Sequence, residues 1–217
     1  MLKKPLILIG GGGHCKSCID VIETTNTWEI KGILDKNFLN GDMVLNYPII
    51  GTDDDIDQLI VDGHYFLITV GQIKSSAIRK RIFDNLTIRN AKIATIISSR
   101  SNVSKYAIIG TGTIVHHHCT INADVIMGDN NIINTAANIE HDVQIGNNNH
   151  ISTCAVLNGN VSLGNNCFIG SASVILNGIT ITDNVIIGAG SLVVKNVDEQ
   201  GIYVGSPSKK IGKWEKL

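Results

Sequence analysis

Two groups of residues in this 217-residue chain have the types and spacing that acid–base and phosphate-binding chemistry require. The first is His141, which stands between Glu140 and Asp142. An imidazole titrates close to neutrality and can accept a proton from a nucleophile, and a neighbouring carboxylate makes it a stronger base by favouring its charged form. On these residues alone, a solvated surface position is the simpler interpretation of His141, so its role stays open at this point.

The second group is the glycine run at residues 10–13, followed by His14, which ends the apolar segment at residues 5–9. Glycines between a strand and a helix let the backbone approach a phosphate closely. The dinucleotide fingerprint Gly-x-Gly-x-x-Gly fails in both registers, because its third glycine falls on Cys15 or Lys16. The loop therefore indicates a nucleotide ligand or a purely structural turn, and it disfavours a dinucleotide-dependent oxidoreductase.

Two further groups suggest metal or redox chemistry without supporting it. Adjacent strand residues alternate faces, so His116, His117 and His118 cannot all face one ion, and we interpret them as a surface-exposed or interface tract. Cys15 and Cys18 form a Cys-x-x-Cys pair, but no second pair and no thioredoxin-like context accompany it. We expect both to be buried thiols of a first helix, and the odd total of five cysteines favours reduced thiols. No metal is predicted.

The elements that position these residues follow two different patterns. Apolar runs typical of buried strands occur at residues 5–9, 28–34 and 65–70, with helices predicted after the first and last. Asp35 and Gly71 directly follow the second and third runs. Such alternation predicts a small parallel sheet, Rossmann-like in its strand–helix order, that binds ligands at the carboxyl ends of its strands.

From residue 97 to residue 193 an aliphatic side chain occupies every sixth position, seventeen times in succession. Six is neither the helical nor the strand period, so it indicates a short strand plus a corner, with Gly, Asn and Asp at the corners. Three such sides close a coil of eighteen residues, and the region predicts between five and six coils of a prism. The aliphatic residues should point inward, and the residues four positions later must be small or slender to fit beside the turn: Val125, Ala137, Val143, Ala155, Val161, Cys167 and Ser173.

Composition narrows the classes of partner. The formal net charge is −1 and no long basic run occurs, which disfavours nucleic acid and anionic membrane as main partners. The four aliphatic residues at positions 6–9 are too few for a signal-peptide core or a membrane span. We expect a cytoplasmic protein whose partners are small molecules and other copies of itself.

The hexads resemble those of the hexapeptide-repeat acyltransferases, whose repeats form a left-handed parallel β-helix and which are typically trimers. Together with the amino-terminal Gly-Gly-Gly-His loop, they are similar to the subgroup of nucleotide-linked 4-amino-sugar N-acetyltransferases and sialic acid O-acetyltransferases. Residues 205–210, Gly-Ser-Pro-Ser-Lys-Lys, are similar to the family's Gly-x-Pro-Ala-Lys segment, with Ser208 where alanine is commoner. The resemblance implies an α/β nucleotide-sugar-binding domain at residues 1–90. A left-handed β-helix domain that binds acetyl-CoA, with a short carboxyl-terminal tail, is implied at residues 91–217.

Residue roles carried over from this resemblance fall into three sets. His141 matches the catalytic base, with Asp142 as the carboxylate that raises its basicity and Glu140 as the fallback. The loop that holds the nucleotide sugar matches Gly12, Gly13, His14, Asp35, Lys36 and Gly71. Contacts to acetyl-CoA match His150, Ser171 and Ala189, the last two through their backbone.

The spacing of the two histidines constrains where such a site can lie. His141 and His150 are nine residues apart, half of an eighteen-residue coil, so they should lie on different parts of one prism. If both serve one reaction, the pocket lies in a cleft between neighbouring prisms. A homotrimer with three equivalent intersubunit active sites satisfies this condition.

The leading hypothesis is an acetyl-CoA-dependent N-acetyltransferase that acts on the C4 amino group of a dTDP- or UDP-linked 4-amino-4,6-dideoxyhexose, for bacterial surface glycan or O-antigen lipopolysaccharide synthesis. Direct attack with His141 as base needs neither a metal nor an acyl-enzyme. O-acetylation of a sialic acid or related nonulosonate is the alternative; His14 and His150 favour the amino-sugar subgroup, whereas residues 151–153 and 156–159 fit either group. A noncatalytic β-helix scaffold is the third possibility.

Overall fold

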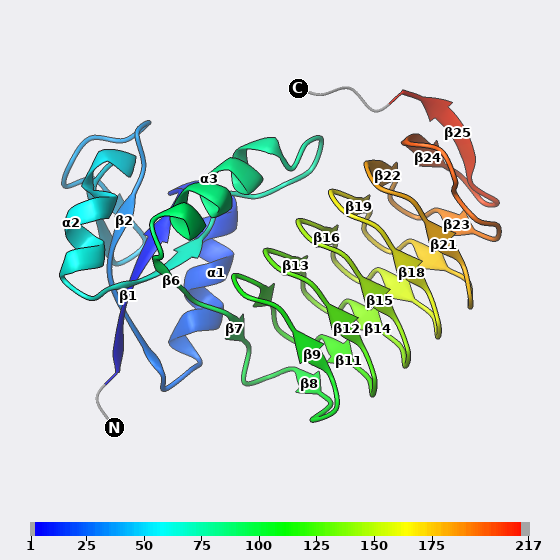
Figure 1. Ribbon diagram of the computed structural model, residues 1–217, viewed down its shortest axis with the longest axis horizontal. Helices are drawn as coiled ribbons and strands as arrows, with labels where there is room; N and C mark the ends of the chain where they lie inside the picture. The colour runs from blue at the N-terminus through cyan, green and yellow to red at the C-terminus, as the bar shows by residue number, and fades with distance from the viewer. Residues whose placement is uncertain (1–2, 214–217) are drawn as a thin grey trace.

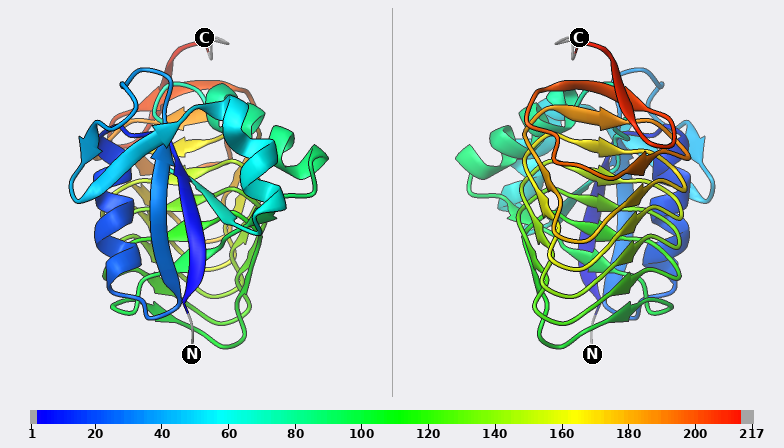
Figure 2. Two further views of the ribbon diagram at one scale, coloured as in Figure 1. Left: turned by 90° about the vertical axis from the view of Figure 1, so that its left-hand side faces the viewer. Right: turned by 90° about the vertical axis from the view of Figure 1, so that its right-hand side faces the viewer.

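The computed structural model describes residues 3–213, which form an α/β layer packed against one side of a left-handed parallel β-helix (Figure 1). Figure 2 shows the coils as successive rungs, with the α/β layer along one side. This confirms the predicted fold class, including the change of pattern between the two halves of the chain.

The α/β layer is built on a six-stranded sheet in the order β3-β4-β2-β1-β5-β6. All its pairings are parallel except β3 with β4. Its strands are β1 (Lys4–Ile9), β2 (Trp28–Leu34), β3 (Met43–Val44), β4 (Tyr47–Gly51), β5 (Tyr65–Ile68) and β6 (Lys92–Ile93). Its helices are α1 (Gly13–Glu23), α2 (Ile56–Val61) and α3 (Ala77–Ile88), with a 3-10 turn η1 (Asp53–Asp55) before α2.

Helix α1 lies between this sheet and the β-helix. Cys15, Cys18 and Ile19 are fully buried on it and belong to one cluster with Ile114 and Ile132 of the coils. The other face of the sheet packs on α2 and α3. The expectation that Cys15 and Cys18 are buried thiols of the first helix is therefore confirmed.

The coils form three sheets, in which each strand up to β22 and β23 pairs parallel and in register with the strand eighteen residues away, whereas β24 pairs parallel with β22 sixteen residues away and β25 pairs antiparallel with β24. The sheet nearest the α/β layer contains β7 (Ile96–Ile97), β10 (Ile114–Val115), β13 (Ile132–Ile133), β16 (His150–Ile151), β19 (Phe168–Ile169), β22 (Val185–Ile187), β24 (Gly201–Val204) and β25 (Lys209–Gly212). The second contains β8 (Asn102–Val103), β11 (Thr120–Ile121), β14 (Asn138–Ile139), β17 (Val156–Leu157), β20 (Val174–Ile175) and β23 (Leu192–Val193). The third contains β9 (Ile108–Ile109), β12 (Ile126–Met127), β15 (Gln144–Ile145), β18 (Ser162–Leu163) and β21 (Thr180–Ile181).

The interior of the prism follows the predicted hexad pattern. The small or slender residues predicted beside the turns, such as Ala137, Ala155 and Cys167, are fully buried. Ile97 pairs in register with Val115 of the prism core and so shares its inward face, yet it is 38% exposed, and Val103 and Ile109 are only half-buried. The reason is that no coil of the described chain stacks on the open side of the first one to cover its interior.

The corners place side chains other than glycine in the left-handed backbone region, which costs roughly 1 kcal/mol or more for most residues and less for Asn and Asp. Asparagine also ties neighbouring coils together: buried Asn131 donates its side-chain amide to the carbonyls of Gly128 and Gly146. Corner residues with positive φ are His118, Asp124, Asn130, Ala136, Asp142, Asn148, Cys154, Asn160, Asn166, Ala172 and Asn184.

No helix within the described part of the chain combines the length and the apolar character needed to cross a lipid bilayer.

Candidate functional site

A cavity of about 810 Å³ opens at the carboxyl ends of β1, β2 and β5, where the α/β layer meets the coils. Side chains from the coils, His150 and Asn134, complete its wall. All of the residues matched to the nucleotide-sugar loop line it: Gly12, Gly13, His14, Asp35, Lys36 and Gly71. The structure therefore brings together residues from the α/β layer, such as Gly12, and residues of the coils as far along the chain as His150.

The glycine loop is held open by Asp35, at the end of β2. Its carboxylate accepts hydrogen bonds from the backbone N–H of Gly11 at 2.6 Å and of Asn37 at 2.8 Å. An added Cβ at Gly12 or Gly13 would meet no described heavy atom within 4 Å, so the protein itself leaves this space free. The first turn of α1 carries no acidic residue, and its free N–H groups and positive dipole end suit a phosphate group.

His150 lies in this same cavity. Its Nδ1 donates to the carbonyl of Gln72 at 2.5 Å, so its Nε2 is the acceptor for the side-chain amide of Asn134 at 3.1 Å. Burial lowers the pKa of His150 to about 4, although the bond to Gln72 opposes this, and the ring is neutral at neutral pH. Within one chain, the residue matched to acetyl-CoA thus adjoins the residues matched to the nucleotide sugar.

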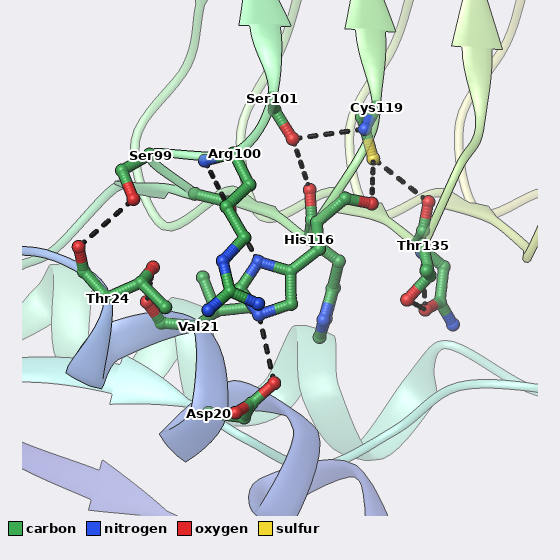
Figure 3. Close-up of polar contacts among 12 residues, drawn as sticks. Asp20, Val21, Thr24, Ser99, Arg100, Ser101, His116, Cys119 and Thr135 are labelled. Atoms are coloured by element: carbon green, nitrogen blue, oxygen red, sulfur yellow. Dashed lines mark hydrogen bonds and ion pairs between the residues drawn. The ribbon is translucent and has the colours of Figure 1, made fainter.

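Of the two alternatives for residues 116–118, a surface-exposed or an interface tract, the surface-exposed one is wrong for His116, which is only 1% exposed and packs beside His14 of α1 where the layer meets the coils. The main chain turns away from the strand direction after β10, which lets His116 face α1 while His118 faces solvent with a positive φ. Figure 3 shows this junction, where Ser101 donates to the carbonyl of His116 at 2.6 Å. His117 bridges the two parts of the molecule through Asp20 at 2.9 Å.

Arg79 of α3 joins the α/β layer to the coils and was not singled out by the sequence. It is 1% exposed and donates only to carbonyls: those of Ile68 and Val70 in the layer, and those of Gly112 and Asn130 in the coils. Burial lowers its pKa to about 10, so it stays charged at neutral pH. An arginine in a polar helix gives no sequence signal for such a role.

His141 follows β14 at the corner between the second and third sheets and is exposed to solvent. Its Nδ1 lies 2.7 Å from a carboxylate oxygen of Asp142, and this hydrogen bond is the main cause that raises the pKa of His141. Glu140 is engaged elsewhere, since it accepts from the side-chain amides of Asn122 and Asn138. Asp142 is therefore the carboxylate that orients His141 in this structure.

Gly159 supports the His141 ring from the next coil. It is buried, and an added Cβ would lie 2.8 Å from Cε1 and 2.9 Å from Nε2 of the imidazole. Gly159 has no positive φ, so the close approach of the ring, rather than the backbone, requires glycine here. It was missed in the sequence, although its spacing of eighteen residues from His141 could have identified it.

The single chain does not bring all the predicted site residues together. His141 is absent from the cavity wall, and β14 and β16 belong to different sheets, so His141 and His150 lie on different sides of the prism. Ser171 and Ala189 lie eighteen residues apart at a third location, the corner after β19 and β22. The Ser171 hydroxyl contacts that of Ser152 at 2.9 Å, and Ala189 is exposed.

Comparison with known families accounts for both halves of this architecture. Residues 5–86 match the PglD N-terminal domain, and residues 160–195 match the bacterial transferase hexapeptide repeats. The chain thus combines a region similar to the PglD N-terminal domain with a region similar to the bacterial transferase hexapeptide repeats. This confirms the resemblance inferred from the hexads and the glycine loop.

Several solved structures are similar over almost the whole chain, and two of them carry bound ligands that bear on function. The acetyltransferase domain of PglB from Neisseria gonorrhoeae, in complex with acetyl coenzyme A, is 29% identical with a TM-score of 0.90, and the match covers 97% of this chain and 100% of that domain. PerB from Caulobacter crescentus, in complex with CoA and GDP-perosamine, is 28% identical with a TM-score of 0.88, covering 96% and 97%.

Curated relatives match over shorter regions. The UDP-N-acetylbacillosamine N-acetyltransferase of Bacillus subtilis is 32% identical over 115 residues, which is 52% of this chain and 51% of that enzyme. A protein of Acanthamoeba polyphaga mimivirus is 39% identical over 111 residues, but only 21% of its length is covered. The match thus spans about half or less of either curated relative.

Proposed function

We propose that this protein is an acetyl-CoA-dependent N-acetyltransferase that acetylates the amino group of a nucleotide-linked amino sugar. The observation that carries the proposal is the match over 96–97% of the chain to proteins crystallised with acetyl-CoA or with CoA and GDP-perosamine. The cavity supports the same conclusion, since the six residues matched to the nucleotide-sugar loop line it.

The reaction is a direct transfer with His141 as general base. The amine nitrogen attacks the thioester carbonyl of acetyl-CoA while its proton passes to Nε2 of His141, which is free because Nδ1 faces Asp142. The tetrahedral oxyanion collapses and the C–S bond breaks. The CoA thiolate leaves and recovers the proton from the imidazolium. The bond to Asp142 makes His141 a stronger base and holds its tautomer.

The finer substrate is a 4-amino-4,6-dideoxyhexose linked to dTDP or UDP, acetylated at the C4 amine for bacterial surface glycan or O-antigen synthesis. Because PerB was crystallised with GDP-perosamine, a GDP-linked amino sugar is tested as well. The expected compartment is the cytoplasm, where the five free cysteines would stay reduced.

The active sites are formed between subunits of a homotrimer. The separation of His141 from the cavity within one chain supports this arrangement, because an amine bound in the cavity needs a histidine from a neighbouring prism. His150, Ser171 and Ala189 would then contact acetyl-CoA in the cleft between prisms, with Ser171 and Ala189 using their backbone.

Thiol release from acetyl-CoA tests the activity. The assay compares dTDP-, UDP- and GDP-linked 4-amino sugars with free sialic acid, using wild-type protein, His141→Ala and, as a matched surface control, His118→Ala. We expect turnover with a nucleotide-linked amine, a loss of at least about 100-fold in kcat for His141→Ala, and no loss for His118→Ala. Turnover with sialic acid alone would establish the O-acetyltransferase alternative, and no turnover with any acceptor would favour a noncatalytic scaffold.

Complementation between variants tests the shared site. His141→Ala keeps its cavity, whereas Gly12→Leu fills the cavity but keeps His141; the space at Gly12 is free of described atoms, so the leucine blocks ligand rather than protein. Trimers reassembled from an equal mixture should regain activity that neither variant has alone. Failure of mixed trimers to regain any activity would contradict an intersubunit site.

A further inference from the structure

Three potential ligand atoms converge where α1 packs on the coils. His14 and Cys18 are four residues apart on α1 and therefore lie on the same face of the helix. His116 approaches them from the turn after β10. One ring nitrogen of each histidine and the Cys18 sulfur all lie within 4.8 Å of one another.

The two histidines of this cluster lack protein partners where they meet. Nε2 of His14 and Nε2 of His116 are buried and form no hydrogen bond with any residue that the structure describes. The histidines next to this cluster do have partners: His117 contacts Ser98 and Asp20, and His150 contacts Gln72 and Asn134. Buried polar atoms normally have a partner, so two unpaired nitrogens beside one thiol indicate a ligand that the protein does not itself provide.

We propose that His14, Cys18 and His116 bind a thiophilic divalent cation of the Zn²⁺ class. Two imidazoles and a thiolate are the ligands that such an ion prefers, and the cluster has no carboxylate that would favour Mg²⁺ or Ca²⁺. Bonds of about 2.0 to 2.3 Å place tetrahedral ligand atoms about 3.3 to 3.8 Å apart, so small side-chain rotations close the cluster around the ion.

The setting provides an entry path and a fourth coordination position. His14 lines the large cavity, so an ion can reach the cluster through it and keep a water molecule on that side. Burial, reinforced by neighbouring charges, keeps both imidazoles neutral and ready to donate a lone pair. Binding exchanges the Cys18 thiol proton for the metal, so one proton is released per ion.

The buried charge of Arg79 makes Cys18 the decisive ligand. The guanidinium is fully buried and donates only to carbonyls among the described residues. Burial is the main cause that lowers the pKa of His14 and His116 and raises the pKa of Cys18; the charge of Arg79 adds to the first effect and opposes the second. A second cation nearby is unfavourable unless an anionic ligand offsets its charge. The Cys18 thiolate is the one anionic donor of the cluster, so its removal should weaken binding more than removal of either histidine.

Titration of the full-length protein with Co²⁺ under reducing, anaerobic conditions tests the site. We expect one Co²⁺ per chain with a thiolate-to-cobalt charge-transfer band that Zn²⁺ abolishes by displacement. The charge-transfer band should disappear in Cys18→Ser. In His116→Asn the apparent affinity for Co²⁺ should fall at least 10-fold. The band should persist in Cys15→Ser, which alters a buried helix thiol outside the cluster, and in His118→Asn, which removes an exposed histidine.

X-ray absorption of the Zn²⁺-loaded wild-type protein keeps the test independent of how the variants fold. One sulfur and two imidazoles around zinc would support the proposal. The proposal would be overturned by a zinc coordination shell without sulfur or by a charge-transfer band that survives in Cys18→Ser. It would also be overturned if the protein bound no stoichiometric metal. No outcome depends on acetyltransferase activity.

Discussion

Replacing Gly159 with alanine should separate the position of the His141 ring from the stability of the fold. The new Cβ would lie 2.8 Å from Cε1 of His141, whereas ordinary contacts begin near 3.4 Å. The ring must therefore move by at least the difference, 0.6 Å, and by about 1 Å for a relaxed contact. Such a movement also stretches the 2.7 Å hydrogen bond to Asp142.

The expected effect is on turnover rather than on folding. A misplacement of about 1 Å in a catalytic group can cost about 100-fold in rate, so kcat should fall between 10- and 100-fold while KM for acetyl-CoA stays near its wild-type value. The fold should tolerate alanine because Gly159 has no positive φ and the contacted atoms belong to an exposed, movable ring. Removing glycine from the unfolded chain even adds about 0.4 to 1 kcal/mol of stability.

Steady-state kinetics and thermal unfolding of the same preparations check this prediction. Gly178→Asn is the matched control, because its backbone is left-handed, its Cβ would meet nothing within 4 Å, and Asn160 already fills the equivalent corner one coil earlier. The control should keep wild-type kcat. Wild-type kcat in Gly159→Ala would refute the positioning argument, and a large drop in its melting temperature would show that Gly159 serves the fold instead.

Four further substitutions test the electrostatics and packing. Asp142→Asn replaces the charged hydrogen-bond acceptor that raises the pKa of His141 with a neutral one, so the acidic limb of the kcat/KM pH profile should move to lower pH and the plateau rate should fall. An unmoved limb would exclude this pairing. Arg79→Met should lower the free energy of unfolding in urea by about 3 kcal/mol or more, because it leaves buried carbonyls without a donor. Ile133→Ala should lower the free energy of unfolding by about 2 to 5 kcal/mol in the same assay, because Ile133 is fully buried. Ile97 is 38% exposed, so Ile97→Ala should lower it by less than about 1.5 kcal/mol. Equal losses would contradict the open end at the first coil.

The arrangement of the prism could be predicted because its information is local and repeated. Each coil imposes the same requirement on its own eighteen residues, so an inward aliphatic side chain and a slender corner residue appear at fixed intervals, as at Ile139 and Val143. The pattern did not predict that the inward-facing Ile97 is 38% exposed, because periodicity does not record where the stack of coils ends. The glycine loop was equally accessible, since residues that directly follow parallel strands meet at one edge of a sheet.

Contacts between the α/β layer and the coils could not be predicted in this way. Periodicity states that His116 and His150 lie on the prism, but it does not state which side of the prism the first domain covers. His116 is buried by α1, which lies about one hundred residues earlier in the chain. Arg79 can be buried because carbonyls of both the α/β layer and the coils accept its hydrogen bonds. These partners share no spacing in the chain.

By itself, the sequence determined the coil, its eighteen-residue turn, the strand–helix order of the first domain, and the half-turn separation of His141 from His150. Only the tertiary structure decided which histidines are buried together, which carboxylate orients His141, and that Gly159 makes room for its ring. The physical reason is that backbone conformation and burial within one coil depend on neighbouring residues, whereas the pKa values and partners of polar side chains depend on whatever the fold packs against them.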